Sequence, residues 1–342
     1  MKLGFIGAGF IARFQSVAIR QVRGLEVAGI LKRRGAEALA GYCREHRLGD
    51  ARIYGSIAEL ARNVDVVALY VPNYCRVEVM EEIGAAVKSG AKLKGVIVDK
   101  PLARNMKEAR RMVELVREAK LLTAYFENQV FMKAIQSQRA QLLPVAQTMG
   151  PLTLTRSAEE HGVDYAKTPA EDFATGMITY RNPETGQIVK SQFTDSWMFE
   201  KQGLRLFMDG MGPGYAFEIN TLVSPLNVFI GDVAAEAIAD QESALEKATA
   251  SRGLLAVQYN EADLYGYTDE NQDMLESFSA GRNAMLSWEY GLEIQRLVMA
   301  SYLSAERGRT IDLTDQAVLA ELDSYVPAIQ QGKGAAQLLH AG

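Results

Sequence analysis

A lysine follows an apolar run in the octapeptide VIVDKPLA, which starts at residue 96. The run is typical of a strand buried on both faces, and a lysine placed directly after it costs free energy to desolvate unless it is paired or used. Lys100 could exchange a proton with the carbinol oxygen of a substrate, and partial burial would lower its pKa from about 10.4. The other interpretation is a structural pair of Asp99 and Lys100 that caps the strand.

A glycine motif, GAGFIA at residues 7–12, directly follows the first apolar segment. Gly7 allows a tight turn and Gly9 lets the backbone approach a pyrophosphate. The position of the motif, at the start of the first strand–helix unit, favours dinucleotide binding, and Phe10 and Ile11 are counted among the cofactor-binding residues. A glycine-containing turn without a ligand is the alternative.

Three cations, Lys32, Arg33 and Arg34, follow the second apolar segment, LEVAGIL. NAD-binding units usually carry an acidic residue here for the ribose 2'-hydroxyl, whereas cations suit the 2'-phosphate of NADP. A solvated basic loop is equally compatible with these residues. The sequence therefore favours NADP over NAD as the cofactor.

The segment LYVPNY places Pro72 and Asn73 at the end of a further strand. In an open parallel sheet the carboxyl ends of the strands line the ligand crevice, so we expect Asn73 and Lys100 on the same rim as the glycine loop. A lysine on that rim would lie beside the nicotinamide of a bound cofactor.

The first 125 residues alternate apolar strand-like segments with amphipathic helix candidates at 56–62, 76–89 and 105–119. This alternation predicts a doubly wound parallel sheet. After about residue 150, strand-like segments follow one another without helices, and the turn residues NPETG at 182–186 predict a hairpin. Helices return at about 270–280 and 289–307, and the tail from residue 330 has the composition of a frayed end.

The expected fold class is therefore α/β, with an N-terminal Rossmann domain over residues 1–125 and a C-terminal α+β domain over 126–342. The C-terminal domain is expected to hold an open, mostly antiparallel sheet. A length of 342 residues agrees with two domains.

Composition and charge exclude several classes of protein. The chain has 37 Lys and Arg against 42 Asp and Glu, and a net charge of -5 argues against a nucleic-acid or anionic-membrane partner. No apolar run reaches the length of a membrane span and Met1 leads straight into a strand, so we expect a cytoplasmic protein. Cys43 and Cys75 are expected to be reduced thiols, and three scattered histidines predict no metal site.

Five segments, in order along the chain, together resemble the Gfo/Idh/MocA oxidoreductases, the family of glucose-fructose oxidoreductase and inositol dehydrogenase: GFIGAGFIA, VALYVPNY, VIVDKPLA, YFENQVF and SYLSAERGRTIDL. The resemblance implies hydride transfer between NAD(P) and a sugar, cyclitol or related polyol. It makes Lys100 the catalytic lysine and places Asn128 near the nicotinamide. Asp99 stands where the family has glutamate, and Arg76 stands where it usually has histidine.

One family segment, a glycine-rich stretch reading roughly G-G-G-x-x-x-D-x-x-x-H, is not found. The chain passes from LTRSAEEHG to VDYAKTPAEDF, and His161 is the histidine near this gap that could contact substrate. Another placement of the motif is MDGMGPGYAFE, with Tyr215 in place of the histidine. That stretch is more typical of two strands joined by a Gly-Pro-Gly turn.

Two functions remain open from the sequence. The first is an NADP-preferring oxidoreductase that acts on a carbohydrate-like small molecule. The second is a catalytically impaired dinucleotide-binding protein that serves as a sensor or as a subunit of an assembly. For either one, we expect the exposed sheet face to be covered by another copy of the chain, in a homodimer or homotetramer.

Overall fold

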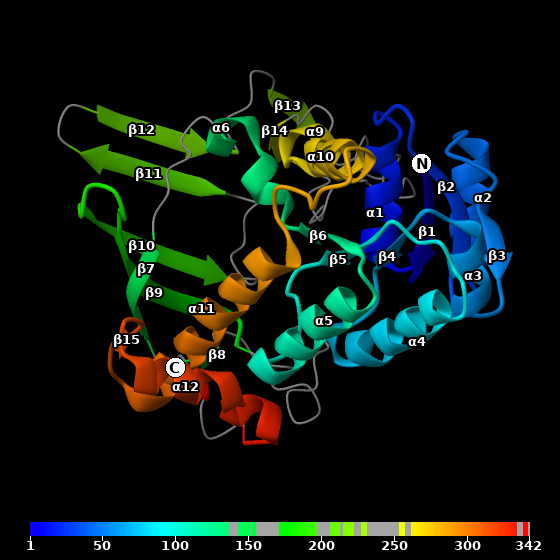
Figure 1. Ribbon diagram of the computed structural model, residues 1–342. Helices are drawn as coiled ribbons and strands as arrows, with labels where there is room; N and C mark the ends of the chain where they lie inside the picture. Colours follow the sequence, from blue (N-terminus) through cyan, green and yellow to red (C-terminus); the bar gives the residue numbers. More distant parts are fainter. Residues whose placement is uncertain are drawn as a thin grey trace.

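The computed structural model describes residues 1–136, 143–150, 152–154, 171–196, 206–212, 215–221, 227–230, 253–256, 261–333 and 338–340. Within these ranges the chain builds two large sheets, one at each side of Figure 1, with helices packed on and between them. The α/β fold class expected from the sequence is confirmed.

The N-terminal sheet has six parallel strands in the order β3-β2-β1-β4-β5-β6. The strands are β1 (Lys2–Ile6), β2 (Glu26–Leu31), β3 (Arg52–Tyr54), β4 (Val66–Leu69), β5 (Gly95–Asp99) and β6 (Leu122–Phe126). Because helices cover both faces, the central strands need apolar residues at successive positions, and residues 96–98 are all fully buried. The strand order reverses between β1 and β4, which is where sheets of this type bind dinucleotides.

Helices cover both faces of this sheet (Figure 1). One face packs against α1 (Phe10–Ile19), α2 (Ala36–Glu45) and α10 (Tyr267–Ser279), and the other against α3 (Ile57–Asn63), α4 (Arg76–Lys88) and α5 (Met106–Glu118). Side-chain caps fix two of the starts: Ser56 accepts a hydrogen bond from Glu59 N at 3.2 Å, and Asn105 accepts one from Glu108 N at 3.1 Å. The three helices expected in this region are thus confirmed.

The C-terminal sheet has strand order β15-β7-β9-β8-β16, with β10 also paired to β9. Its strands are β7 (Leu143–Met149), β8 (Leu152–Leu154), β9 (Phe173–Arg181), β10 (Ile188–Ser196), β15 (Ile311–Asp312) and β16 (Leu338–His340). The pairs are antiparallel except β8 with β16, so a mostly antiparallel sheet is confirmed. In the expected hairpin turn, Asn182 Oδ1 accepts hydrogen bonds from Glu184 N at 2.9 Å and Thr185 N at 3.1 Å.

Two details of this sheet differ from expectation. The strand β7 was not foreseen because Pro144 interrupts it, and the pairing with β9 shifts register between Pro144 and Ala146. The tail was expected to be frayed, yet Leu338–His340 forms a strand because it pairs with β8.

The long helix α11 (Trp288–Arg307) joins the two sheets, lying between α5 and β7 (Figure 1). At its start, the fully buried Trp288 donates from Nε1 to the main-chain oxygen of Ala124 in β6 at 3.1 Å. Near its end, Ser304 Oγ accepts from Met149 N in β7 at 2.8 Å. The core of the Rossmann sheet therefore includes residues from the C-terminal part of the chain, and the domain boundary after residue 125 stays a prediction.

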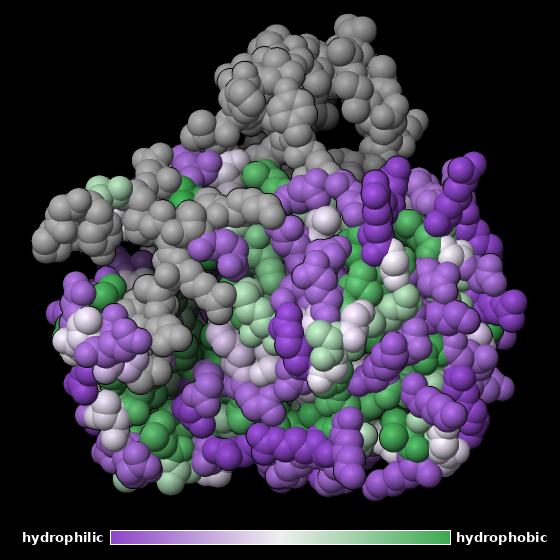
Figure 2. All heavy atoms as spheres, turned by 45° about the horizontal axis from the view of Figure 1, so that its top comes forward, coloured by the Kyte–Doolittle hydropathy of each residue, from purple (hydrophilic) through white to green (hydrophobic). Residues whose placement is uncertain are grey.

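Shorter elements complete the described chain. They are η1 (Asn73–Cys75), η2 (Asn128–Phe131), α6 (Lys133–Gln136), α9 (Glu261–Leu264), α12 (Gln316–Ser324), η3 (Ala328–Gln331) and two two-stranded sheets, β11 (Phe207–Gly212) with β12 (Tyr215–Asn220) and β13 (Asn227–Ile230) with β14 (Gly253–Ala256). Among the helices of the described ranges, none has both the length and the apolar composition needed to cross a membrane. In the face shown in Figure 2, polar side chains predominate and apolar ones lie scattered between them.

Candidate active site

The glycine loop lies at the switch point between β1 and β4. Gly7 has φ 123°, and a Cβ on it would overlap with the main-chain oxygen of Tyr70 at the end of β4. Only glycine fits this position without displacing the backbone. Gly9, the N-cap of α1, has open space where a Cβ would stand. The helix N-terminus behind it therefore has room for the pyrophosphate of a dinucleotide.

The residues that follow Gly9 differ in exposure. Phe10 begins α1 with 59% of its surface exposed, whereas Ile11 is partly buried. Tyr74, in η1 at the end of the neighbouring strand, is 64% exposed. Exposed aromatic side chains beside a glycine loop offer flat surfaces to a ligand. Tyr74 was not predicted from the sequence as a site residue, although an aromatic residue directly after Pro72 and Asn73 was a usable signal.

The basic loop between β2 and α2 lies against the glycine loop. A Cβ on Gly35 would be 3.0 Å from the main-chain oxygen of Ala8, and Lys32, Arg33 and Arg34 are all exposed. Burial raises the pKa of the Cys75 thiol, and the charge of Arg33 is among the influences that oppose this. Arg33 thus lies within electrostatic range of the loop after β4, on the carboxyl edge of the sheet.

Lys100 is the first residue after β5, on the same edge of the sheet as Pro72 and Asn73. Its main-chain N donates to the oxygen of Phe126 at 3.2 Å, and its peptide bond to Pro101 is cis. The side chain is exposed, so the expected partial burial of this lysine was wrong. The apolar strand ends one residue before it, and the ammonium group reaches solvent at the rim.

Arg76 organises the main chain on either side of Lys100. Its side chain is only 4% exposed at the start of α4. Its Nη1 donates to the main-chain oxygens of Asp99, at 2.6 Å, and of Pro101, while Nε donates to the oxygen of Val71 at 3.2 Å. Burial lowers the pKa of Arg76 and the charge of Asp99 opposes this. One guanidinium therefore ties the end of β4 to the segment that carries Lys100.

Glu127 follows the last residue of β6 and is partly buried. Burial raises its pKa to about 7, with Lys100 lowering it, Asp99 raising it and a hydrogen bond with Tyr125 lowering it. Glu127 was not among the site residues predicted from the sequence. The available signal was a carboxylate at the end of the strand that follows the lysine's strand along the chain.

Of three other site residues predicted from the sequence, two lie within the described part of the chain. Asn128 is 6% exposed, and its Nδ2 donates to the main-chain oxygen of Tyr265 at 2.8 Å. Tyr215 is the first residue of β12 and pairs with Gly212, which confirms the two-strand interpretation of that segment. His161 lies outside the described residues. The roles of all three stay predictions.

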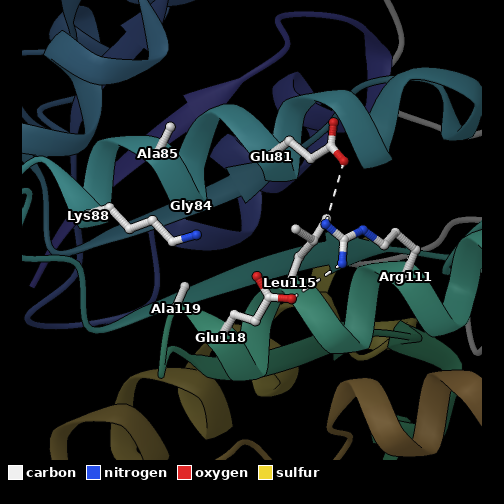
Figure 3. Close-up of a pocket in the computed structure, with 8 residues that line it drawn as sticks. All are labelled: Glu81, Gly84, Ala85, Lys88, Arg111, Leu115, Glu118 and Ala119. Atoms are coloured by element: carbon white, nitrogen blue, oxygen red, sulfur yellow. Dashed lines mark hydrogen bonds and ion pairs between the residues drawn. The ribbon is translucent and has the colours of Figure 1, made fainter.

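A surface groove between α4 and α5 is a separate feature (Figure 3). Arg111 spans it, with ion pairs to Glu81 at 3.7 Å and to Glu118 at 3.3 Å. Helices in such sheets run back toward the amino ends of the strands, so the second halves of α4 and α5 lie away from the glycine loop. The groove is therefore not part of the crevice that holds Lys100.

Comparison with known proteins agrees with the fold and the glycine loop. Residues 1–126 match the family model GFO_IDH_MocA, described as an oxidoreductase family with an NAD-binding Rossmann fold. The N-terminal part of the chain therefore has an NAD-binding Rossmann fold, and the resemblance to the Gfo/Idh/MocA family is confirmed over residues 1–126. A curated relative, the 1,5-anhydro-D-fructose reductase of Ensifer adhaerens, is 35% identical over 118 residues. The match spans 34% of this chain and 33% of the relative.

Solved structures of similar fold cover almost the whole chain. GenD2 from gentamicin A biosynthesis, solved with NAD, has a TM-score of 0.70 at 14% identity over 92% of this chain and 96% of its own. The scyllo-inositol dehydrogenase from Lactobacillus casei, solved with NAD(H) and scyllo-inositol, has a TM-score of 0.63 at 9% identity over 92% and 99%. At these identities the likeness establishes the fold.

Proposed function

We propose that the protein is an NAD(P)-dependent oxidoreductase acting on a hydroxyl or carbonyl group of a sugar, cyclitol or related polyol. The observation that carries this proposal is the placement of Lys100 on the same sheet edge as an open glycine loop. The family model that matches residues 1–126 and the reductase that is 35% identical over 118 residues support the same class of reaction.

The chain's own residues would divide the work as follows. The N-terminus of α1 and the space above Gly9 would hold the pyrophosphate. The bound nicotinamide supplies or accepts the hydride. Lys100 would donate a proton to the substrate oxygen during reduction and remove it during oxidation. Arg76 would keep the main chain around Lys100 in place, so that the ammonium meets the oxygen at a fixed position.

The finer cofactor preference is also part of the proposal. The loop after β2 offers Lys32, Arg33 and Arg34 and abuts the glycine loop at Gly35, an arrangement that suits the 2'-phosphate of NADP. The loop's exposure leaves all three side chains accessible to a ligand.

We further propose a homodimer or homotetramer. Met177 on β9 and Ile188 on β10 are 41% and 49% exposed, and the strand register puts both on one face of the C-terminal sheet. Phe193 and Ala174 point to the opposite face, which packs on Met149 and Ile329. Two exposed apolar residues on this face support its burial against a second copy. The two free thiols suit a reducing compartment such as the cytoplasm.

The test separates cofactor binding from turnover. NADPH and NADH affinities would be measured by fluorescence titration, and oxidation of each would be followed across a panel of aldoses, ketoses and inosose-type ketones. Binding together with turnover of at least one carbohydrate-like compound is the expected result. Tight binding without turnover on any of them would instead support the dinucleotide-binding protein that lacks catalysis, and absence of both would contradict either function.

A further inference from the structure

Lys100 and Glu127 are neighbours across two parallel strands. The register of β5 and β6 pairs Asp99 with Phe126, and Lys100 N donates to Phe126 O at 3.2 Å, so the next pair is Lys100 with Glu127. Paired residues of parallel strands point to the same face of a sheet. The ammonium and the carboxyl group therefore extend from adjacent positions on the same face of the sheet, at the rim that carries the glycine loop.

The protein surrounds Glu127 on several sides. Tyr125, two residues before Glu127, shares a hydrogen bond with it. The ring of Tyr125 packs against α11, where a Cβ on Gly291 would be 2.8 Å from the ring. The charged and titratable groups within electrostatic range of Glu127 are Asp99 at the end of β5, Lys100 directly after it, Tyr125 from β6 and Glu270 from α10. The environment is thus partly apolar, with one cation next to the carboxyl group.

We propose that Glu127 exchanges protons with Lys100 and so restores the lysine to its reactive protonation state after each turnover. This inference rests on the proposed oxidoreductase function. Glu127 acts through Lys100 and does not touch the reacting atoms, so it is a positioning residue of the site and Lys100 remains the catalytic one.

The proton balance can be written for carbonyl reduction. The Lys100 ammonium gives a proton to the substrate oxygen, its N–H bond breaks, an O–H bond forms and a neutral amine remains. The Glu127 carboxylic acid then gives its proton to that amine, and the resulting carboxylate takes a proton from solvent. An amine is a stronger base than a carboxylate, so the second transfer runs downhill. In alcohol oxidation the same transfers run in reverse.

Two properties of Glu127 suit this task. Burial shifts its pKa to about 7, so near neutral pH both the acid and the carboxylate are populated. Lys100 influences Glu127 through its charge and not through a direct hydrogen bond, so a water molecule would bridge the ammonium and the carboxyl group. A surface glutamate, ionised throughout the neutral range, would have no proton to give.

The experiment compares wild type, Glu127→Gln, Glu127→Asp and, as a surface control, Glu81→Gln in the groove of Figure 3. On the best substrate of the panel, the pH profile of kcat for the wild type should bend near pH 7, the pKa of Glu127. Glu127→Gln should lower kcat by about 10- to 100-fold and lose the bend, while NADPH affinity stays unchanged. Glu127→Asp should keep a bend, and Glu81→Gln should match the wild type. Full kcat with an unchanged profile in Glu127→Gln would overturn the proposal.

A second readout does not depend on turnover. The protonation of Glu127 can be followed by infrared difference spectra of wild type against Glu127→Gln over a pH titration. In a Lys100→Met background the midpoint should rise, because the cation that stabilises the carboxylate is gone. An unmoved midpoint would refute the coupling. If the wild type turned over no compound, the oxidoreductase function would fall, and the infrared shift alone would decide whether the two groups share a proton equilibrium.

Discussion

The guanidinium of Arg76 donates a hydrogen bond to the main-chain oxygen of Asp99 at 2.6 Å, one residue before Lys100. A second bond from the same nitrogen reaches Pro101, one residue after it. Arg76 therefore holds both neighbours of the lysine. Because the guanidinium is buried at the start of α4, the position of Lys100 depends on a residue that is almost closed to solvent.

Removal of Arg76 should affect both stability and turnover. Arg76→Ala leaves main-chain oxygens of the crevice without their donor, and we expect the free energy of unfolding in urea to fall by about 2–5 kcal/mol. Arg76→Lys keeps the charge but not the planar guanidinium group. Its free energy of unfolding should lie between those of the wild type and Arg76→Ala. The matched control is Arg111→Ala, because solvent screens its surface ion pairs and their loss should change the free energy of unfolding much less. Equal losses for Arg76→Ala and Arg111→Ala would show that the buried contacts are not structural.

The two glycines of the loop should respond differently to alanine. Gly7→Ala meets both an unfavourable φ and the oxygen of Tyr70, so it should destabilise the protein by at least about 1–3 kcal/mol. Gly9→Ala has open space around its Cβ and should cost less than about 1 kcal/mol. Its methyl group would stand where the pyrophosphate binds, and dinucleotide affinity measured by calorimetry should fall at least about tenfold. Unchanged affinity in Gly9→Ala would place the cofactor elsewhere.

The basic loop gives a prediction on cofactor preference. The double variant Arg33→Ala, Arg34→Ala should weaken NADPH by about 1–3 kcal/mol per lost contact and leave NADH almost unchanged. Arg23→Ala is the control, because Arg23 is exposed just before β2, at the opposite end of that strand. Titration of each variant with both cofactors checks this. Equal losses for NADPH and NADH would remove the argument for NADP.

Glu270 on α10 makes stability depend on pH. It is 1% exposed, Gln15 Nε2 donates to its Oε1 at 2.8 Å, and burial raises its pKa well above the ordinary range. The folded state therefore keeps a proton that the unfolded state releases above about pH 4.3, so its contribution to stability decreases as pH rises. Glu270→Gln should flatten the change in urea midpoint between about pH 5 and about pH 8. Glu37→Gln, a substitution of an exposed residue, is the control and should leave the change in urea midpoint as it is in the wild type. If the urea midpoint of Glu270→Gln changed as steeply with pH as that of the wild type, Glu270 would be ionised in the folded protein.

Much of the fold followed from sequence patterns because local rules determine it. Buried parallel strands need continuous apolar runs, and the glycine loop needs residues without a Cβ at a close backbone approach, so both are visible along the chain. The strand β7 was not visible along the chain, because a proline such as Pro144 argues against a strand. It forms because it pairs with β9, which the local sequence does not indicate.

The candidate site was only partly foreseeable. Lys100, Asn73 and the glycine loop could be placed together, because strand ends share an edge. Arg76 and Glu127 could not be assigned roles, because their contacts depend on which strands are neighbours and on how the end of β4 approaches β5. The exposure of Lys100 likewise depends on where the strand ends, which the sequence alone does not determine to the residue.

The most direct test of the account is the turnover of Lys100→Met with the best substrate of the panel, measured alongside NADPH affinity. Lys100 is exposed, so the substitution should leave the fold intact, and Lys94→Met, at the other end of the same strand, is the matched control. We expect kcat/KM to fall by about 10²- to 10⁴-fold in Lys100→Met, with NADPH affinity within a few-fold of wild type and Lys94→Met unaffected. Turnover that persists at the wild-type rate without Lys100 would contradict the assignment of this lysine as the proton donor and acceptor.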